Sequence, residues 1–147
     1  MEELNKTATI KVLCRYLSEN YGDNYTYEGF NHNRIIETHL GPMQDNNTIE
    51  IYAFSKKSED KYLMIEIGIQ NDFRQIYIPK IFTPALLQHN GVGKKLIRLI
   101  FEIGLLYGYH VFVVQLTDSF RARLLSRGAV ETDQFDTLQI VRSTRLN

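Results

Sequence analysis

The chain has 147 residues, of which 44% are hydrophobic and 12% aromatic, and its 17 basic side chains balance its 17 acidic ones. This length and composition suit one compact domain over residues 1–147 with a real hydrophobic core, and the zero net charge excludes a general attraction to nucleic acid or to an anionic membrane. The single cysteine cannot form an internal disulfide, and no stretch approaches the roughly 20 apolar residues of a membrane span, so we expect a cytoplasmic protein.

The first periodic segment runs from Lys6 to Tyr21. Apolar side chains at positions 10, 13, 14 and 17 form one stripe, which predicts an amphipathic helix with Asn5 or Thr7 as its cap. Cys14 lies on that stripe, so we interpret it as a core residue and not as a nucleophile. The following segment, 21–33, is rich in Gly, Asn and aromatic residues without a regular period, which predicts a loop that takes part in recognition.

Four strands are expected next, because apolar and polar residues alternate and turn residues separate the segments. Their short connections favour antiparallel neighbours, so the strands form a meander with one apolar face. The expected strands are Arg34 to Leu40, Ile49 to Ser55, Tyr62 to Ile69 and Arg74 to Phe82.

A glycine-bearing loop, residues 88–93, joins the last of these strands to an amphipathic segment from Val92 to Tyr107. A strand, such a loop and a helix start in this order form a cradle for phosphate, because the first free N–H groups of the helix and its dipole attract an anion. Lys94 and Lys95 add positive charge beside it. The alternative is a tight turn that binds nothing.

The remaining elements complete the sheet. Gly108 ends the long helix, and His110 to Thr117 reads as a buried strand that a helical crossover places parallel to the strand before the loop. A final helix, capped by Asp118 or Ser119, is expected through Arg127, and a strand from 137 to 142 follows it.

The spacing Gln88-x-x-Gly91-x-Gly93, followed by a basic amphipathic helix, a strand and a short polar helix, resembles the acetyl-CoA-binding segment of the GNAT superfamily of N-acyltransferases over residues 73–142. The resemblance implies a GNAT-like α/β (α+β) fold, in which an antiparallel meander precedes a parallel β-α-β crossover and helices lie on both faces. It also implies a splay between the strand ending near Phe82 and the strand from His110, where a pantetheine arm lies.

The resemblance further implies acetyl-CoA as cosubstrate and a set of residues that bind it. Backbone groups at 76–78 would pair with pantetheine, the N–H groups from 88 to 94 would hold the diphosphate, and two residues of the last helix would contact the cofactor. The expected residues are Ile76, Tyr77, Ile78, Gln88, His89, Asn90, Gly91, Val92, Gly93, Lys94, Phe120 and Arg121.

Acyl transfer needs a base for the amine and a stabilised thiolate. Glu66 and Tyr77 are the candidate catalytic residues. Many members of this family carry a proton-donating tyrosine four residues before the last helix's terminal glycine, whereas this chain has Leu124 there, with Ser119 and Ser126 as the nearby hydroxyls. The connection from the strand to the glycines is also a few residues longer than usual, which predicts a displaced or bulged strand end.

We therefore expect an N-acetyltransferase that moves an acetyl group directly, without a covalent enzyme intermediate, to a primary amine of a small molecule, peptide or protein. The alternatives are a catalytically silent CoA-binding module that acts through a protein partner, and an unrelated α+β interaction protein. No metal is expected, because His32, His39, Asp45 and Glu50 show no ligand spacing. Neither a membrane nor a nucleic-acid partner is expected, and the resemblance allows a homodimer.

Overall fold

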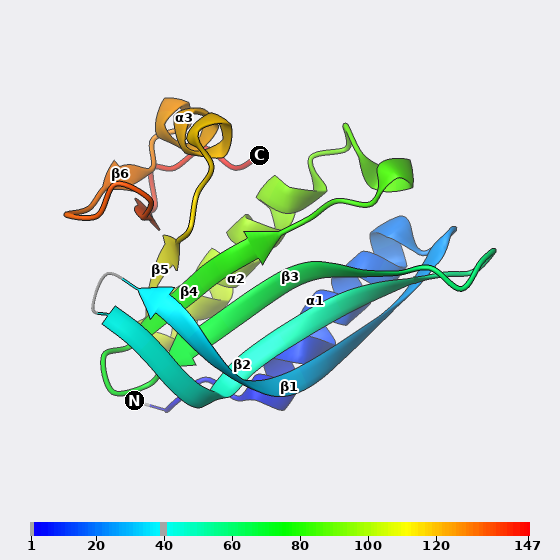
Figure 1. Cartoon of the computed structure of the whole chain (residues 1–147), viewed down its shortest axis with the longest axis horizontal. Coiled ribbons are helices and arrows are strands. Elements are labelled where there is room, and N and C mark those ends of the chain that lie inside the picture. The colour runs from blue at the N-terminus through cyan, green and yellow to red at the C-terminus, as the bar shows by residue number, and fades with distance from the viewer. Residues whose placement is uncertain (1, 39–40) are drawn as a thin grey trace.

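A single mixed β-sheet organises the computed structural model, which describes residues 2–38 and 41–147 (Figure 1). The strand order is β1-β2-β3-β4-β5-β7-β6. Strands β1 to β4 form an antiparallel meander, β4 and β5 are parallel, and the remaining pairs are antiparallel, which confirms the expected fold class. The strands are β1 (Tyr25–Thr38), β2 (Gly41–Ser55), β3 (Lys61–Gln70), β4 (Gln75–Ile81), β5 (His110–Val113), β6 (Val130–Glu131) and β7 (Leu138–Ile140).

The helices begin and end where local chemistry requires. Helix α1 spans Lys6–Tyr21 as expected, and the Asn5 side chain caps it by accepting a hydrogen bond from the Ala8 N–H at 2.9 Å. Helix α2 (Val92–Tyr107) also has its expected bounds and ends at Gly108, whose φ of 76° places it in the left-handed region.

Two shorter helical elements complete the fold, the 3-10 helix η1 (Ala85–Leu87) and helix α3 (Asp118–Ser126). The cap of α3 is Thr117 and not Asp118 or Ser119, because the Thr117 hydroxyl accepts a hydrogen bond from the Phe120 N–H at 3.3 Å. The cap therefore lies one residue earlier than expected, and its hydroxyl accepts from an N–H group that has no partner within the helix.

The prediction of a loop over residues 21–33 is wrong, since β1 starts at Tyr25 and pairs with β2. Its side chains alternate in burial: Tyr25 and Tyr27 are buried whereas Thr26 and Glu28 are exposed. The buried positions of this alternating pattern are tyrosines and not aliphatic residues, so the pattern was not recognised as a strand. Positions 39–40 of the strand expected over 34–40 lie outside the described residues.

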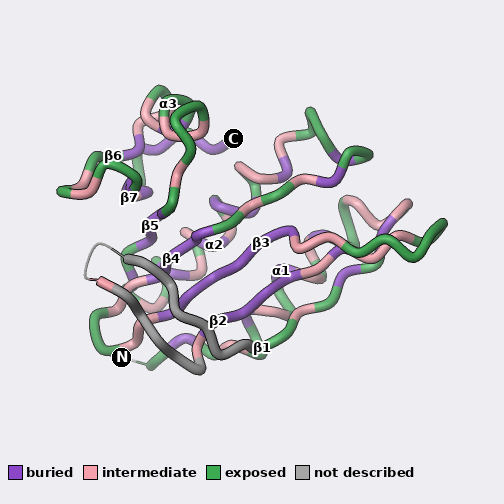
Figure 2. The backbone as a smooth tube through the Cα atoms, in the orientation of Figure 1, coloured by how far each residue is buried: buried purple, intermediate pink, exposed green. Residues whose placement is uncertain are grey.

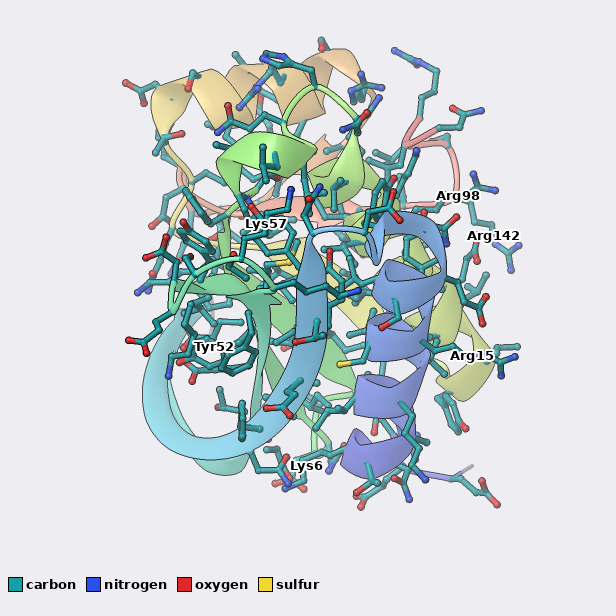
Figure 3. The ribbon with its side chains drawn as sticks, turned by 90° about the vertical axis from the view of Figure 1, so that its right-hand side faces the viewer. Lys6, Arg15, Tyr52, Lys57, Arg98 and Arg142 are labelled. Carbon is teal, nitrogen blue, oxygen red and sulfur yellow. The ribbon has the colours of Figure 1, made fainter. Side chains whose placement is uncertain are left out.

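Helices α1 and α2 cover one face of the sheet, and the main core lies beneath them. Ile10 of α1 approaches β1 and β2, while Gly104 of α2 lies against Ile76 and Val111. Figure 2 shows the inner strands β3 and β4 as the most continuously buried part of the chain. On the opposite face β1 reaches β4, and Tyr77, Phe112 and Val114 form a small second core. Figure 3 shows α1 on one side and the bent β1 and β2 strands on the other.

The end of β4 is bulged, as the sequence predicts. Between the pairs Gly68↔Tyr77 and Glu66↔Lys80, β3 advances two residues and β4 three, so β4 holds one extra residue beside Pro79. The Phe82 N–H then donates to Met64 at 2.8 Å, which turns the N–H and C=O of the preceding Ile81 away from β3. The bulge thus presents a polar backbone edge on the side where β5 would lie.

We predict that Gly29→Ala destabilises the fold by about 1–3 kcal/mol. A Cβ at position 29 would lie 2.3 Å from the Ile10 Cγ2 and 2.9 Å from the Ile51 Cδ1, so the Ile10 side chain, or α1 with it, would have to move. Urea denaturation measures the loss. The control is Thr26→Ala, an exposed position on the same strand, and a Gly29→Ala midpoint equal to that of the control would contradict this packing.

Candidate functional site

The site begins where β4 and β5 separate. Their pairing runs from Gln75↔His110 to Ile78↔Val113, and its last bond joins the Val114 N–H to the Ile78 carbonyl at 3.1 Å. Gln115 follows with a φ of 56°, a left-handed conformation that turns the chain away from β4. Since β4 continues to Ile81, the two strands diverge, and the splay that the family resemblance implies is present.

A cavity of about 950 Å³ occupies this opening. It passes through the sheet, because Leu63 and Lys80 line it from the face opposite the helices and Val92 and Gly93 line it from the helix side. Figure 1 shows η1, the start of α2 and α3 around the end toward which β4 points. The further lining residues are Ile78, Pro79, Ile81, Phe82, Thr83, Leu87, Gln88, His89, Gly91, Lys94, Val113, Val114, Gln115, Leu116, Thr117, Phe120, Arg123, Leu124 and Arg127.

The glycine loop forms one wall of this cavity. Gly91 is the N-terminal cap of α2 with a φ of 70°, and His89 has the same φ of 70°. Two side-chain amides brace the loop: Asn90 donates to the Leu87 carbonyl at 3.2 Å and Gln88 donates to the Thr83 carbonyl at 3.3 Å. Asn90, expected to contact the cofactor, is absent from the cavity wall, because its side chain folds back onto the loop.

The first turn of α2 points its N–H groups at the cavity. The first helical bond of this turn runs from the Lys95 N–H to the Gly91 carbonyl at 3.1 Å, so the N–H groups of Val92, Gly93 and Lys94 precede the helical ladder. Gly91 supplies no side-chain cap. A Cβ on Gly93 would lie 3.3 Å from the Ile81 Cγ2, so glycine lets the helix start approach the end of β4. This arrangement favours an anion.

The charged side chains that line the cavity also favour an anionic ligand. Four basic residues, Lys80, Lys94, Arg123 and Arg127, line the cavity, and no Asp or Glu lines it among the described residues. Lys95, the other lysine of the helix start, instead donates to the Tyr21 hydroxyl at 3.0 Å. The chain is neutral overall, so the site concentrates positive charge that composition conceals.

The expected pantetheine pairing at 76–78 needs a correction. Ile76 and Tyr77 are paired with β5 on one side and with β3 on the other, so no strand can be added there. Of the three residues only Ile78 lines the cavity. The open edge begins beyond the bulge, at Ile81.

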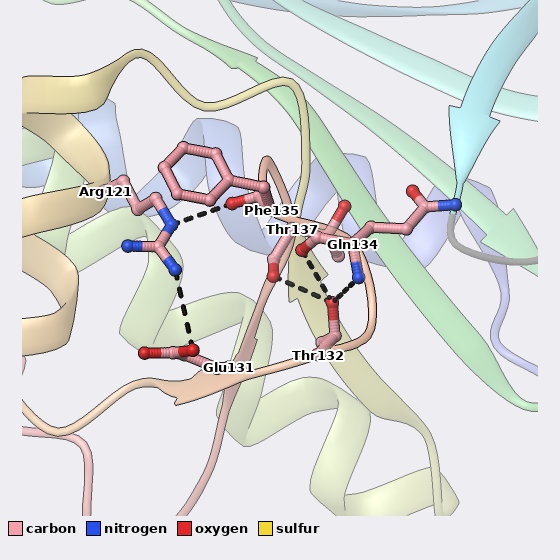
Figure 4. A network of polar contacts seen from close by, with 6 residues as sticks. All are labelled: Arg121, Glu131, Thr132, Gln134, Phe135 and Thr137. Carbon is pink, nitrogen blue, oxygen red and sulfur yellow. Dashed lines mark hydrogen bonds and ion pairs between the residues drawn. The ribbon is translucent and has the colours of Figure 1, made fainter.

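Helix α3 presents a different arginine from the one expected. Phe120 lines the cavity, but Arg121 does not. The Arg121 Nε donates to the Phe135 carbonyl at 2.7 Å, its guanidinium lies 4.1 Å from the Phe135 ring centroid, and its Nη2 lies 3.7 Å from the Glu131 carboxylate (Figure 4). Arg121 therefore ties α3 to the C-terminal segment.

Lys80, Arg123 and Arg127 are cationic cavity residues that the sequence interpretation missed. For the two arginines the available signal was helical spacing, because positions 120, 123, 124 and 127 share one face of a helix. Leu124 lies on that face and is 1% exposed. Ser119 and Ser126 do not line the cavity, and the Ser126 hydroxyl donates to the Arg123 carbonyl at 2.7 Å.

Neither candidate catalytic residue reaches the cavity wall. Glu66 is 5% exposed within β3. Tyr77 is fully buried and stacks on Phe112 with ring centroids 5.5 Å apart, and its hydroxyl donates to the Gln75 amide oxygen. The structure therefore places Tyr77 in the small second core and Glu66 as a buried carboxyl group on β3, and the catalytic roles of both stay predictions.

Within the described ranges, no three side chains among His, Cys, Asp and Glu come together as a metal site. His39, one of the residues considered, lies outside those ranges. None of the described helices has the length and apolar character that a membrane crossing requires.

No family model and no curated protein matches this chain. Among solved structures, it is similar to nourseothricin acetyltransferase, with 13% identity, a TM-score of 0.42 and coverage of 79% of this chain and 95% of that one. It is also similar to mutant forms of the spermidine/spermine N-acetyltransferase SpeG from Vibrio cholerae, with 14% identity, a TM-score of 0.43 and coverage of 97% and 92%. Neither likeness identifies a reaction for this chain.

The fold is GNAT-like. This statement rests on the strand order, the parallel crossover and the split between β4 and β5, and it concerns the architecture alone.

We predict that Cys14 is unreactive in the folded protein. Burial, with a smaller effect from the negative charge of Glu28, raises the pKa of its thiol from 9.0 to about 11. A shift of this size leaves about a hundredfold less thiolate at pH 8 than in the unfolded chain. Thiol titration with a chromogenic disulfide at pH 8, with and without denaturant, measures this difference. Equal rates in both conditions would contradict the buried placement.

Proposed function

We propose that the protein is an N-acetyltransferase that transfers an acetyl group from acetyl-CoA to a primary amine of a small molecule, peptide or protein. One observation carries the proposal: the free N–H groups of the α2 start and four cationic side chains face a cavity that passes through the sheet where β4 and β5 part. A ligand with an anionic end and a narrow uncharged arm fits this shape.

The lining of the cavity supports the binding of the diphosphate and the pantetheine arm of acetyl-CoA. The N–H groups of Val92, Gly93 and Lys94 would hold the diphosphate, and Lys94 adds a charge beside them. The arm would pass between Ile81 and the chain after Val113, with the outward-turned backbone of Ile81 as its hydrogen-bonding partner. The thioester would then emerge toward the face opposite α1 and α2.

The chemistry is direct displacement. A neutral amine attacks the thioester carbon, the C–N bond forms and the C–S bond breaks, and a proton leaves the amine while the thiolate acquires one. Backbone N–H groups at the split are suited to stabilise the oxyanion. A water molecule in the cavity would take the proton from the amine, since the described residues place no carboxylate in the cavity wall.

A second candidate is a silent CoA-binding module that acts through a protein partner. The observation that favours it is Leu124, an apolar side chain in the cavity wall at the position where a proton-donating tyrosine is expected. Both candidates share the binding site and differ only in whether transfer follows.

We predict that Gly91→Asp weakens acetyl-CoA binding roughly tenfold or more, because it places a carboxylate against the diphosphate. Isothermal titration measures the affinity. The matched control is Gly91→Asn, which is neutral and tolerates the same left-handed backbone, so it should bind nearly as the unmodified protein does. Equal affinities of the Asp and Asn variants would contradict diphosphate binding at this helix start.

We predict acetyl-CoA consumption that depends on an added amine. The assay follows release of free thiol from acetyl-CoA over a panel of small polyamines, aminoglycosides and peptides with free N-termini or lysines. Product mass increased by one acetyl group confirms the enzyme. Binding of acetyl-CoA without thiol release on any amine would instead favour the silent module.

A further inference from the structure

Two arginines at the C-terminal end of α3 line the same cavity as the start of α2. Arg123 and Arg127 are one helical turn apart and both line the cavity. The α2 start, which lines the same cavity, already supplies three N–H groups and Lys94 for one anionic group. Two further guanidinium groups without any carboxylate in the described wall therefore indicate a second anion.

We propose that Arg123 and Arg127 form a subsite for a phosphomonoester dianion, which in the ligand of the proposed function is the 3′-phosphate of CoA. A phosphomonoester carries about two negative charges at neutral pH and three strong acceptor oxygens, and arginine binds such a group through parallel N–H bonds. The subsite would make the protein selective for CoA over its 3′-dephosphorylated form.

The surroundings of the two arginines suit this role. The Arg123 guanidinium lies 5.5 Å from the Phe120 ring centroid, so an apolar ring supports one of its faces while its side chain stays exposed. Arg127 donates one N–H to the Arg145 carbonyl at 3.1 Å, which anchors the side chain and leaves the other donors of its guanidinium for a ligand.

A purely structural reading is available for each residue. Arg123 lies in the last turn of α3 and Arg127 is its C-terminal cap, where positive charge complements the helix dipole. That reading predicts a loss of stability on substitution but no change in ligand selectivity. Selectivity is therefore the property that separates the two readings.

The experiment compares acetyl-CoA with acetyl-dephospho-CoA by isothermal titration, in the unmodified protein and in Arg123→Gln and Arg127→Gln. The unmodified protein should bind acetyl-CoA about ten- to hundredfold more tightly. Each variant should lose most of that preference by weakening acetyl-CoA binding alone. The control is Arg98→Gln, which removes one positive charge from an exposed site that pairs with Glu102 and lies on the α1 side of the molecule (Figure 3).

The outcomes separate this proposal from the function on which it rests. Equal binding of both ligands by the unmodified protein overturns the subsite and leaves the proposed function standing. Binding of neither ligand overturns both. A preference that survives in Arg123→Gln and Arg127→Gln as it does in Arg98→Gln also overturns the subsite. Circular dichroism verifies that each variant is folded, and Arg123→Gln alone suffices if loss of the Arg145 contact unfolds Arg127→Gln.

Discussion

The separation of β4 from β5 is the constraint on which the whole site depends. Two local features produce it. An extra residue beside Pro79 rotates the end of β4, and a left-handed residue, Gln115, turns the chain away immediately after β5. A regular ladder on both strands would close the opening, so the cavity exists because the pairing stops at Ile78.

Two glycines let helix α2 pack closely against the sheet, one in the core and one beside the opening. Gly104 allows close contact with Ile76 and Val111 in the core, and Gly93 allows close contact with Ile81 at the cavity. The helix axis therefore ends at the split, with its positive dipole end directed into it. Positive side chains from β4, α2 and the end of α3 line the cavity. The chain has no net charge, so this positive charge is a local property of the site.

Much of the architecture could be predicted from sequence because the relevant signals are local. The bounds of α1 and α2 follow from an apolar stripe and their terminal residues Asn5 and Gly108, and the bulged strand end followed from an unusually long connection. Strand β1 was missed because its buried positions are tyrosines. Arg121 was chosen over Arg123 because sequence order does not show which side of a short helix faces the cavity, whereas contacts with Phe135 and Glu131 decide it.

The most direct test of the account is the change in backbone amide resonances when acetyl-CoA is added. The account predicts that the amides of Ile81 and of Gly91 to Lys94 shift together and saturably, while those of Ile76 and Tyr77, already paired within the sheet, change little. Shifts confined to other parts of the chain, or no shifts at millimolar acetyl-CoA, would contradict a diphosphate held by the α2 start and an arm that enters the split.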